Sequence, residues 1–176
     1  MKRSIFIICL LVFSQLQGQT GTESQLLLIS KKIVNQNQSD SLNLVSIFNW
    51  ITDNIEYDVK TYQQNLDYPY FIIDPNLDSA SYMKVYNSKV SEMVIRTKKA
   101  ICDGYSRLFL SLCELAKIQC KYITGKVRFP LRDELAEHAW NAVLINNQWY
   151  LLDITWASGY VSRNSFVEKR KTFSSI

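Results

Sequence analysis

The chain has 176 residues, of which 47% are hydrophobic and 20% are charged, and its formal net charge is +4. This composition is typical of a folded globular protein and excludes a wholly disordered chain. Because the net charge is modest and forms no basic stripe, the sequence gives no reason to expect a nucleic acid partner.

Residues 1–18 have the pattern of a secretory signal peptide. The basic pair Lys2 and Arg3 precedes a short apolar run over 5–13, and polar and small residues follow. The apolar run is well short of the ~20 residues that a membrane-spanning helix needs. We therefore expect cleavage near Gly18, a secreted or periplasmic location, and no stable membrane insertion of the mature chain. Cleavage lowers the net charge to +2 and leaves about 155 residues, the usual size of one domain.

Two helices are expected in the first third of the chain. Apolar residues over 23–35 have the spacing of an amphipathic helix, and we assign 19–40 to an N-terminal helical segment. A clearer helix is predicted from 41 to 55, with Asp40 as its N-cap. Its apolar side chains repeat at the helical spacing and indicate one buried face: Leu44, Val45, Phe48, Ile51 and Ile55.

The middle of the chain leads to a strongly helical stretch. Residues 58–88 contain prolines and many Asn, Asp and Tyr residues without periodicity, which predicts an irregular, partly packed excursion. A short helix is expected over 91–99. Residues 104–117 carry a continuous apolar stripe that predicts a helix. Since Cys102 falls on the same face as Phe109, two turns away, its thiol is expected to point inward at the first turn.

The last third of the chain has the pattern of a β-sheet. Alternation with period two predicts a strand over 121–127. Two further strands are expected over 138–145 and 148–155, because these segments flank the pair Asn146-Asn147, which suits a two-residue hairpin turn.

This turn determines which residues share a face of the sheet. If Ile145 pairs with Gln148, then His138 and Asp153 become diagonal neighbours on one side of the hairpin, about 7 Å apart at the backbone. A slip of one residue would move Asp153 to the other face. The turn therefore predicts a His–Asp contact.

Three cysteines remain after cleavage of the signal peptide: Cys102, Cys113 and Cys120. An odd number leaves at least one thiol without an intrachain partner in an oxidising compartment. A bridge between Cys113 and Cys120 would leave Cys102 free, whereas both can equally be small buried hydrophobes. The chain has no C-x-x-C pair and only one histidine, so we expect neither a metal site nor a cofactor.

Cys102, His138 and Asp153 form a candidate catalytic set. A helix N-terminus and a nearby imidazolium both stabilise a thiolate, and the backbone N–H groups of the first turn can hold an oxyanion. His138 is the one candidate for the general base, and Asp153 would accept its second N–H. These are the parts of a thiol nucleophile with an oriented base.

Three sequence blocks resemble the signature blocks of the transglutaminase-like superfamily. The blocks read CDGYS at 102–106, HAWN at 138–141 and WYLLDITW at 149–156. The similarity is closest to microbial members and to the kyphoscoliosis-peptidase type. Residues 50–58 also resemble the helix and Tyr-Asp corner that precede the Cys block, so the resemblance covers roughly residues 41–167.

The resemblance implies a papain-like α+β fold, in which a Cys-bearing helix packs against an antiparallel β-sheet carrying His and Asp. By position in the blocks, Cys102 matches the nucleophile, His138 the general base and acid, and Asp153 the orienting carboxylate. Many relatives continue with further strands after the Asp block. We therefore expect 41–176 to be a transglutaminase-like domain that is either minimal or truncated at its C-terminus.

Members of this family include cross-linking acyltransferases, peptidases, amidases and proteins that have lost catalysis. The resemblance implies an exported thiol hydrolase or acyltransferase that acts on amide bonds of a protein or peptide substrate through an acyl-enzyme. The alternative is a non-catalytic binding or assembly domain that retains the fold. Because Cys102, His138 and Asp153 are all present, the enzyme is the favoured hypothesis.

Overall fold

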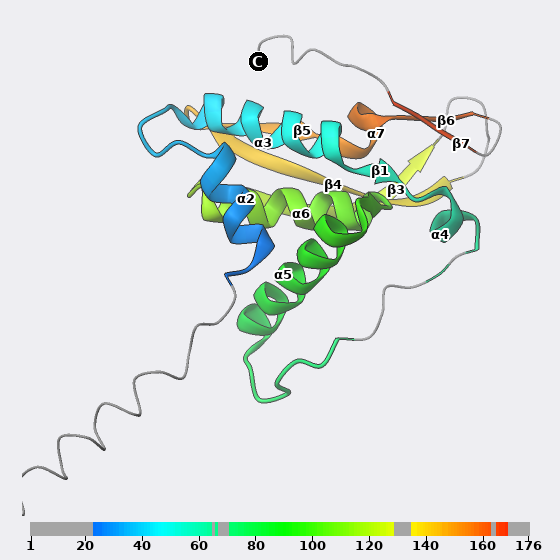
Figure 1. Ribbon diagram of the computed structural model, residues 1–176, viewed down its shortest axis with the longest axis horizontal. Coiled ribbons are helices and arrows are strands. Elements are labelled where there is room, and N and C mark those ends of the chain that lie inside the picture. The colour runs from blue at the N-terminus through cyan, green and yellow to red at the C-terminus, as the bar shows by residue number, and fades with distance from the viewer. Residues whose placement is uncertain (1–22, 65, 67–70, 129–134, 163–164, 169–176) are drawn as a thin grey trace, which may run out of the picture.

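A computed structural model describes residues 23–64, 66, 71–128, 135–162 and 165–168. Helices and a three-stranded antiparallel sheet of order β3-β4-β5 pack together around helix α6, which contacts β4, α5 and α3 (Figure 1). In chain order the elements are α2 (Gln25–Ile33), α3 (Asp40–Asn54), β1 (Glu56–Tyr57), α4 (Val59–Gln63), α5 (Ser79–Thr97), β2 (Lys99–Ala100), α6 (Cys102–Leu115), β3 (Cys120–Arg128), β4 (Leu135–Ile145), β5 (Gln148–Leu152), α7 (Ile154–Ser158), β6 (Gly159–Ser162) and β7 (Ser165–Glu168).

The β4–β5 hairpin has the predicted turn and register. Ile145 pairs with Gln148, and the ladder continues to the pair of Asn141 with Leu152. Asn146 and Asn147 have φ angles of 50° and 63°, the left-handed conformation that a two-residue hairpin turn requires and that Asn tolerates. Both predictions are therefore confirmed.

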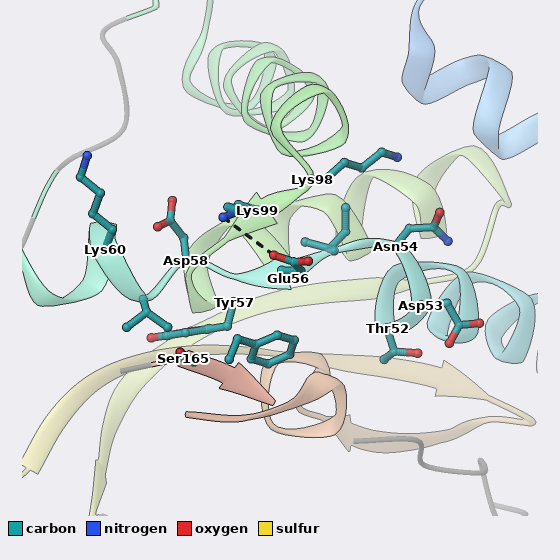
Figure 2. A pocket seen from close by; sticks show the side chains of 13 residues that line it. Thr52, Asp53, Asn54, Glu56, Tyr57, Asp58, Lys60, Lys98, Lys99 and Ser165 are labelled. Carbon is teal, nitrogen blue, oxygen red and sulfur yellow. Dashed lines mark ion pairs between the residues drawn. The ribbon is translucent and has the colours of Figure 1, made fainter. Parts of the chain in front are cut away.

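A short parallel pair, β1 with β2, joins the end of α3 to the start of α6. Glu56 pairs with Lys99 and Tyr57 pairs with Ala100, and an ion pair of 3.8 Å links the Glu56 and Lys99 side chains (Figure 2). The N–H of Asp58 donates to the carbonyl oxygen of Ala100 at 2.8 Å. This pairing holds the segment after α3 against the chain that leads into Cys102.

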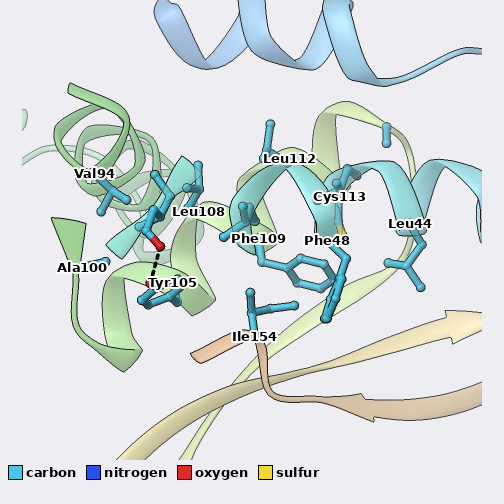
Figure 3. Packing of buried hydrophobic residues seen from close by; sticks show 14 of the residues in the cluster. Leu44, Phe48, Val94, Ala100, Tyr105, Leu108, Phe109, Leu112, Cys113 and Ile154 are labelled. Atoms are coloured by element: carbon cyan, nitrogen blue, oxygen red, sulfur yellow. Dashed lines mark hydrogen bonds between the residues drawn. The ribbon is translucent and has the colours of Figure 1, made fainter. Parts of the chain in front are cut away.

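The hydrophobic core lies on the inward stripe of α6, as the periodicity over 104–117 predicts. Tyr105, Leu108, Phe109, Leu112 and Cys113 have no exposed surface (Figure 3). They pack against buried side chains of α3, α5 and β4. The Tyr105 hydroxyl donates to the carbonyl oxygen of Ile55 at 2.6 Å, so the only polar atom of that side chain is satisfied in the core. The core thereby anchors the first turn of α6.

Two predictions about helix starts and irregular chain are wrong. Ser39, not Asp40, is the N-cap of α3, since its hydroxyl accepts the N–H of Leu42 at 3.4 Å. The excursion predicted over 58–88 contains α4 and the first half of α5, and the helix expected over 91–99 is the end of that same helix.

The first half of helix α5 was not predicted because polar residues interrupt its buried face. Asn87 and Ser91 are buried there, and the Ser91 hydroxyl hydrogen-bonds to the Ser111 hydroxyl of α6 at 3.0 Å. A buried face that mixes polar and apolar residues gives only a weak apolar period. The N-cap was readable, since the Asp78 carboxylate accepts the N–H groups of Ala80 and Ser81.

The strand predicted over 148–155 is too long. Strand β5 ends at Leu152, and Asp153 becomes the N-cap of α7. A carboxylate that accepts a backbone N–H three residues later favours a helix start over a further strand residue.

The N-terminal helical segment contributes α2, which packs against α3, α5 and α6. The predicted signal peptide, 1–18, lies outside the described residues. Within the described part of the chain, no helix combines the length and apolar character needed to cross a membrane.

Candidate active site

The structure brings the three predicted residues together. Cys102 is the first residue of α6 and is partly exposed, His138 lies on β4, and Asp153 follows β5. His138 Nε2 lies 2.7 Å from Asp153 Oδ2. The Cys102 thiol also interacts with this imidazole: after burial, which lowers the pKa of His138, and the hydrogen bond with Asp153, a hydrogen bond with Cys102 is among the causes that raise that pKa. One histidine thus contacts both a thiol and a carboxylate.

The pKa of His138 reflects these two contacts. Burial alone would lower it, because the side chain is only 6% exposed. The hydrogen bonds to Asp153 and Cys102, together with the negative charges of both groups, outweigh burial and raise the pKa of His138 to about 9. His138 is therefore an imidazolium at neutral pH, and its positive charge lies beside the thiol.

The start of α6 leaves backbone donors next to Cys102. The N-cap residue, Ile101, is extended and makes no side-chain capping hydrogen bond. The first turn of a helix has N–H groups without intrahelical partners, and these carry the positive end of the helix dipole. Such a helix start stabilises an anion at the position of the thiol.

Asp153 holds two elements with its two oxygens. Oδ1 accepts the N–H of Trp156 at 3.1 Å and caps α7, while Oδ2 faces His138. The cap prevents the carboxylate from rotating away from the imidazole. The acceptor therefore selects which ring nitrogen carries the proton.

Two tryptophans stack on His138. The ring of Trp156 lies 5.2 Å and that of Trp140 6.0 Å from the imidazole, with interplanar angles of 26° and 23°. Gly125 makes room for Trp140, since a Cβ at that position would lie 2.8 Å from the indole Cη2. A hollow of about 230 Å³, lined mainly by apolar side chains, opens beside these rings and the His–Asp pair.

A larger hollow of about 710 Å³ lies around the β1–β2 pair, and Tyr57 lines it (Figure 2). Most of its other side chains are polar or charged, including Asp53, Glu56, Lys60 and Lys98. Burial, and after it the negative charge of Cys102, raises the pKa of Tyr57, so the Tyr57 side chain lies within electrostatic reach of the thiol.

A polar network supports the residue after Cys102. The Arg107 Nε donates to both oxygens of Asp103 at 2.9 Å, and the Tyr122 hydroxyl also donates to Asp103. Arg107 also donates to Asn87 at 2.6 Å, and its guanidinium lies between the rings of Tyr86 and Tyr122. The network joins α5, α6 and β3 where Cys102 begins the helix.

The bridge considered between Cys113 and Cys120 is not formed. All three described cysteines are free thiols. Burial, followed by a hydrogen bond with Cys120, raises the pKa of Cys113 well above its ordinary value. These two thiols are structural neighbours in the core region.

Sequence reasoning gave no role to several residues around the site. The pair of Asp103 and Arg107 was readable, because oppositely charged residues four apart meet on one helix face. The stacking of Trp156 depends on the helix that follows β5, which was predicted as strand. The place of Tyr57 depends on pairing between residues 43 positions apart in the chain, for which the sequence carries no local signal.

Comparison with known proteins agrees with this geometry. The family model of the transglutaminase-like superfamily matches residues 29–154. Kyphoscoliosis peptidase of Mus musculus and that of Homo sapiens are each 29% identical to this chain, over 150 and 154 residues. The alignments cover 82% and 84% of this chain but 20% of each relative, so the chain spans about a fifth of their length.

Among solved structures, a TGase superposes with a TM-score of 0.50 at 15% identity, covering 95% of this chain and 41% of that one. This likeness concerns the fold. Together with the family match over most of the chain, it confirms the predicted architecture of a Cys-bearing helix on an antiparallel sheet that carries His and leads into Asp. The chain therefore belongs to the transglutaminase-like superfamily, a family that contains thiol-dependent enzymes, and has its papain-like α+β fold.

Proposed function

We propose that this protein is a thiol-dependent hydrolase or acyltransferase that acts on amide bonds. One observation carries the proposal: a single imidazole contacts both the Cys102 thiol and, at 2.7 Å, the Asp153 carboxylate, at the start of a helix. In this arrangement Cys102 is the nucleophile, His138 the general acid and base, and Asp153 the orienting carboxylate.

In the first half of the reaction the Cys102 thiolate attacks the carbonyl carbon of the amide. A C–S bond forms, and the carbonyl oxygen becomes an oxyanion held by N–H groups at the start of α6. The His138 imidazolium then gives its proton to the leaving nitrogen, and the C–N bond breaks. The products are a free amine and a thioester on Cys102.

In the second half, water or an amine attacks the thioester. The neutral His138 imidazole takes a proton from the attacking group, the C–S bond breaks, and Cys102 leaves as a thiolate beside the restored imidazolium. Water gives hydrolysis, whereas an amine gives a new amide. The same residues serve both outcomes.

The substrate class proposed is a protein or peptide. The relatives named kyphoscoliosis peptidase support this choice, and the two hollows that Tyr57 and His138 line give room for a peptide chain. We also propose that the protein is exported, since residues 1–18 have the pattern of a secretory signal peptide.

The test is formation of an acyl-enzyme. We expect purified protein to release a burst of 4-nitrophenol from 4-nitrophenyl acetate, with a mass increase of one acetyl group on Cys102. The Cys102→Ala variant should fold and give no burst, and Cys113→Ala serves as the matched control that keeps it. Fluorescent casein and dansylcadaverine then separate hydrolysis from amine incorporation. If the wild-type protein forms no acyl-enzyme with any of these probes, the enzyme hypothesis is wrong and the alternative, a non-catalytic binding domain, takes its place.

A further inference from the structure

Backbone pairing holds Tyr57 next to the start of α6, the helix that begins at Cys102. It lies opposite Ala100 in the β1–β2 pair, and the flanking N–H of Asp58 donates to the Ala100 carbonyl at 2.8 Å. Ala100 is two residues before Cys102. From this position the Tyr57 side chain lies along the hollow of about 710 Å³ (Figure 2).

Among the described residues, the Tyr57 hydroxyl is a donor without a partner. The side chain is half-buried, and its ring packs against that of Tyr62 with centroids 5.9 Å apart. Its hydroxyl makes no hydrogen bond with any part of the chain that the structure describes. Burial first, and then the negative charge of Cys102, raises the pKa of Tyr57, so the hydroxyl keeps its proton. A half-buried hydroxyl near a nucleophile, without a partner in the described chain, is available to a ligand.

Other donors near the thiol are already occupied. The Tyr122 hydroxyl, which also interacts with Cys102, donates to Asp103. The Asn141 amide donates to the carbonyl oxygens of Ser106 and Lys121 at 3.1 and 3.3 Å. The Tyr57 hydroxyl differs from these two groups, because it makes no hydrogen bond within the described part of the chain.

We propose that the Tyr57 hydroxyl donates a hydrogen bond to the substrate carbonyl oxygen as it becomes an oxyanion, together with an N–H at the start of α6. Two donors at this oxygen are the usual means of stabilising a tetrahedral intermediate. The proton stays on Tyr57, and no bond to it forms or breaks. Tyr57 is in this sense a catalytic residue, and the inference rests on the proposed acyl transfer.

The test compares Tyr57→Phe with Tyr62→Phe. Tyr62 is the matched control, because it has the same phenol and packs against Tyr57 but does not line the hollow. Two reactions of Cys102 are measured. Acetylation by 4-nitrophenyl acetate passes through an oxyanion, whereas alkylation by iodoacetamide does not.

We expect Tyr57→Phe to slow acetylation about 100-fold, the scale on which one oxyanion donor acts. The loss should appear in kcat, with KM changed less than about twofold, because the hydrogen bond strengthens only as the oxyanion forms. Alkylation should proceed at the wild-type rate, and Tyr62→Phe should match wild type in both reactions. Since the hydroxyl has no partner among the described residues, its removal leaves none of their polar groups unsatisfied, and the melting temperature should equal that of wild type.

Three other outcomes would overturn either the role of Tyr57 or the proposed function. Equal acetylation by wild type and Tyr57→Phe overturns the role of Tyr57 and leaves the proposed function standing. An equal fall in acetylation and alkylation means that Tyr57 only positions Cys102, and it also overturns this role. A wild type that is alkylated but never acetylated overturns the proposed function itself, and the role of Tyr57 with it.

Discussion

Replacing Asp153 by Asn tests the electrostatics of the site with a nearly isosteric change. Asn retains an oxygen that can accept the N–H of Trp156, so α7 keeps its cap. On the other side, the 2.7 Å contact with His138 Nε2 loses a negative charge. When the Asn oxygen caps α7, the NH2 group of Asn faces His138 Nε2. Two donors then face each other unless the imidazole adopts the other tautomer, which is the wrong one for catalysis.

The structure gives the size of the effect. The pKa of His138 is about 9, against an ordinary value of 6.5. Each pKa unit is worth about 1.4 kcal/mol, so the imidazolium is favoured by about 3 kcal/mol. Asp153 comes before Cys102 among the groups that raise this pKa. We therefore expect Asp153→Asn to lower the pKa of His138 by about one unit or more, and turnover to fall by up to about 10⁴-fold, the loss given by the same exchange in a serine-protease triad.

The sign of the pH dependence follows from the raised pKa. Imidazolium is present below about pH 9 in the wild type and is lost as the pH rises through that value. Because the imidazolium protonates the leaving nitrogen, hydrolysis of peptide amides should decline through about pH 9, and in Asp153→Asn the decline should begin at lower pH. Asp78→Asn is the control, since Asp78 caps α5 at an exposed position. The reasoning is refuted if Asp153→Asn keeps both the wild-type rate and the wild-type alkaline decline.

Three further predictions concern reactivity and stability. Iodoacetamide should label Cys102 before Cys113, which is fully buried, and equal labelling by mass spectrometry would make Cys102 an inert thiol. Arg107→Met should cost about 3 kcal/mol in urea unfolding because it leaves the Asp103 carboxylate, only 24% exposed, without its ion pair; a cost under about 1 kcal/mol would contradict this. Phe109→Ala should cost about 4 kcal/mol by opening a cavity in the core, which a melting temperature near that of wild type would disprove.

Local pattern predicted the parts of the fold that local forces determine. The helix over 104–117 and the Asn146-Asn147 turn were readable, since a continuous apolar stripe and a pair of residues that tolerate positive φ each specify one structure. The turn then gave the register of β4 with β5, and with it the approach of His138 to Asp153.

The remaining features depend on interactions that the sequence does not display. Helix α5 buries Asn87 and Ser91 through hydrogen bonds, so these polar residues interrupt its otherwise apolar inward face. Asp153 reads as the continuation of a strand until its carboxylate is seen to cap α7. The pairing of Tyr57 with Ala100 is formed across the intervening helices α4 and α5 and has no local signal. Sequence therefore indicated the three candidate residues but not the groups around them.

The Asn146-Asn147 turn controls chemistry at the far end of its hairpin. His138 lies seven residues before the end of β4, roughly 20 Å from the turn at strand spacing. Surface loops usually accept insertions, but one extra residue here would shift β5 along β4 by one position. Leu152 would then no longer pair with Asn141, and Asp153, the next residue, would move relative to His138. The loop is thus free to vary in composition among residues that accept a left-handed backbone, while its length is constrained. For protein engineering it is a poor site for a tag or an inserted domain, although it is exposed and distant from the thiol.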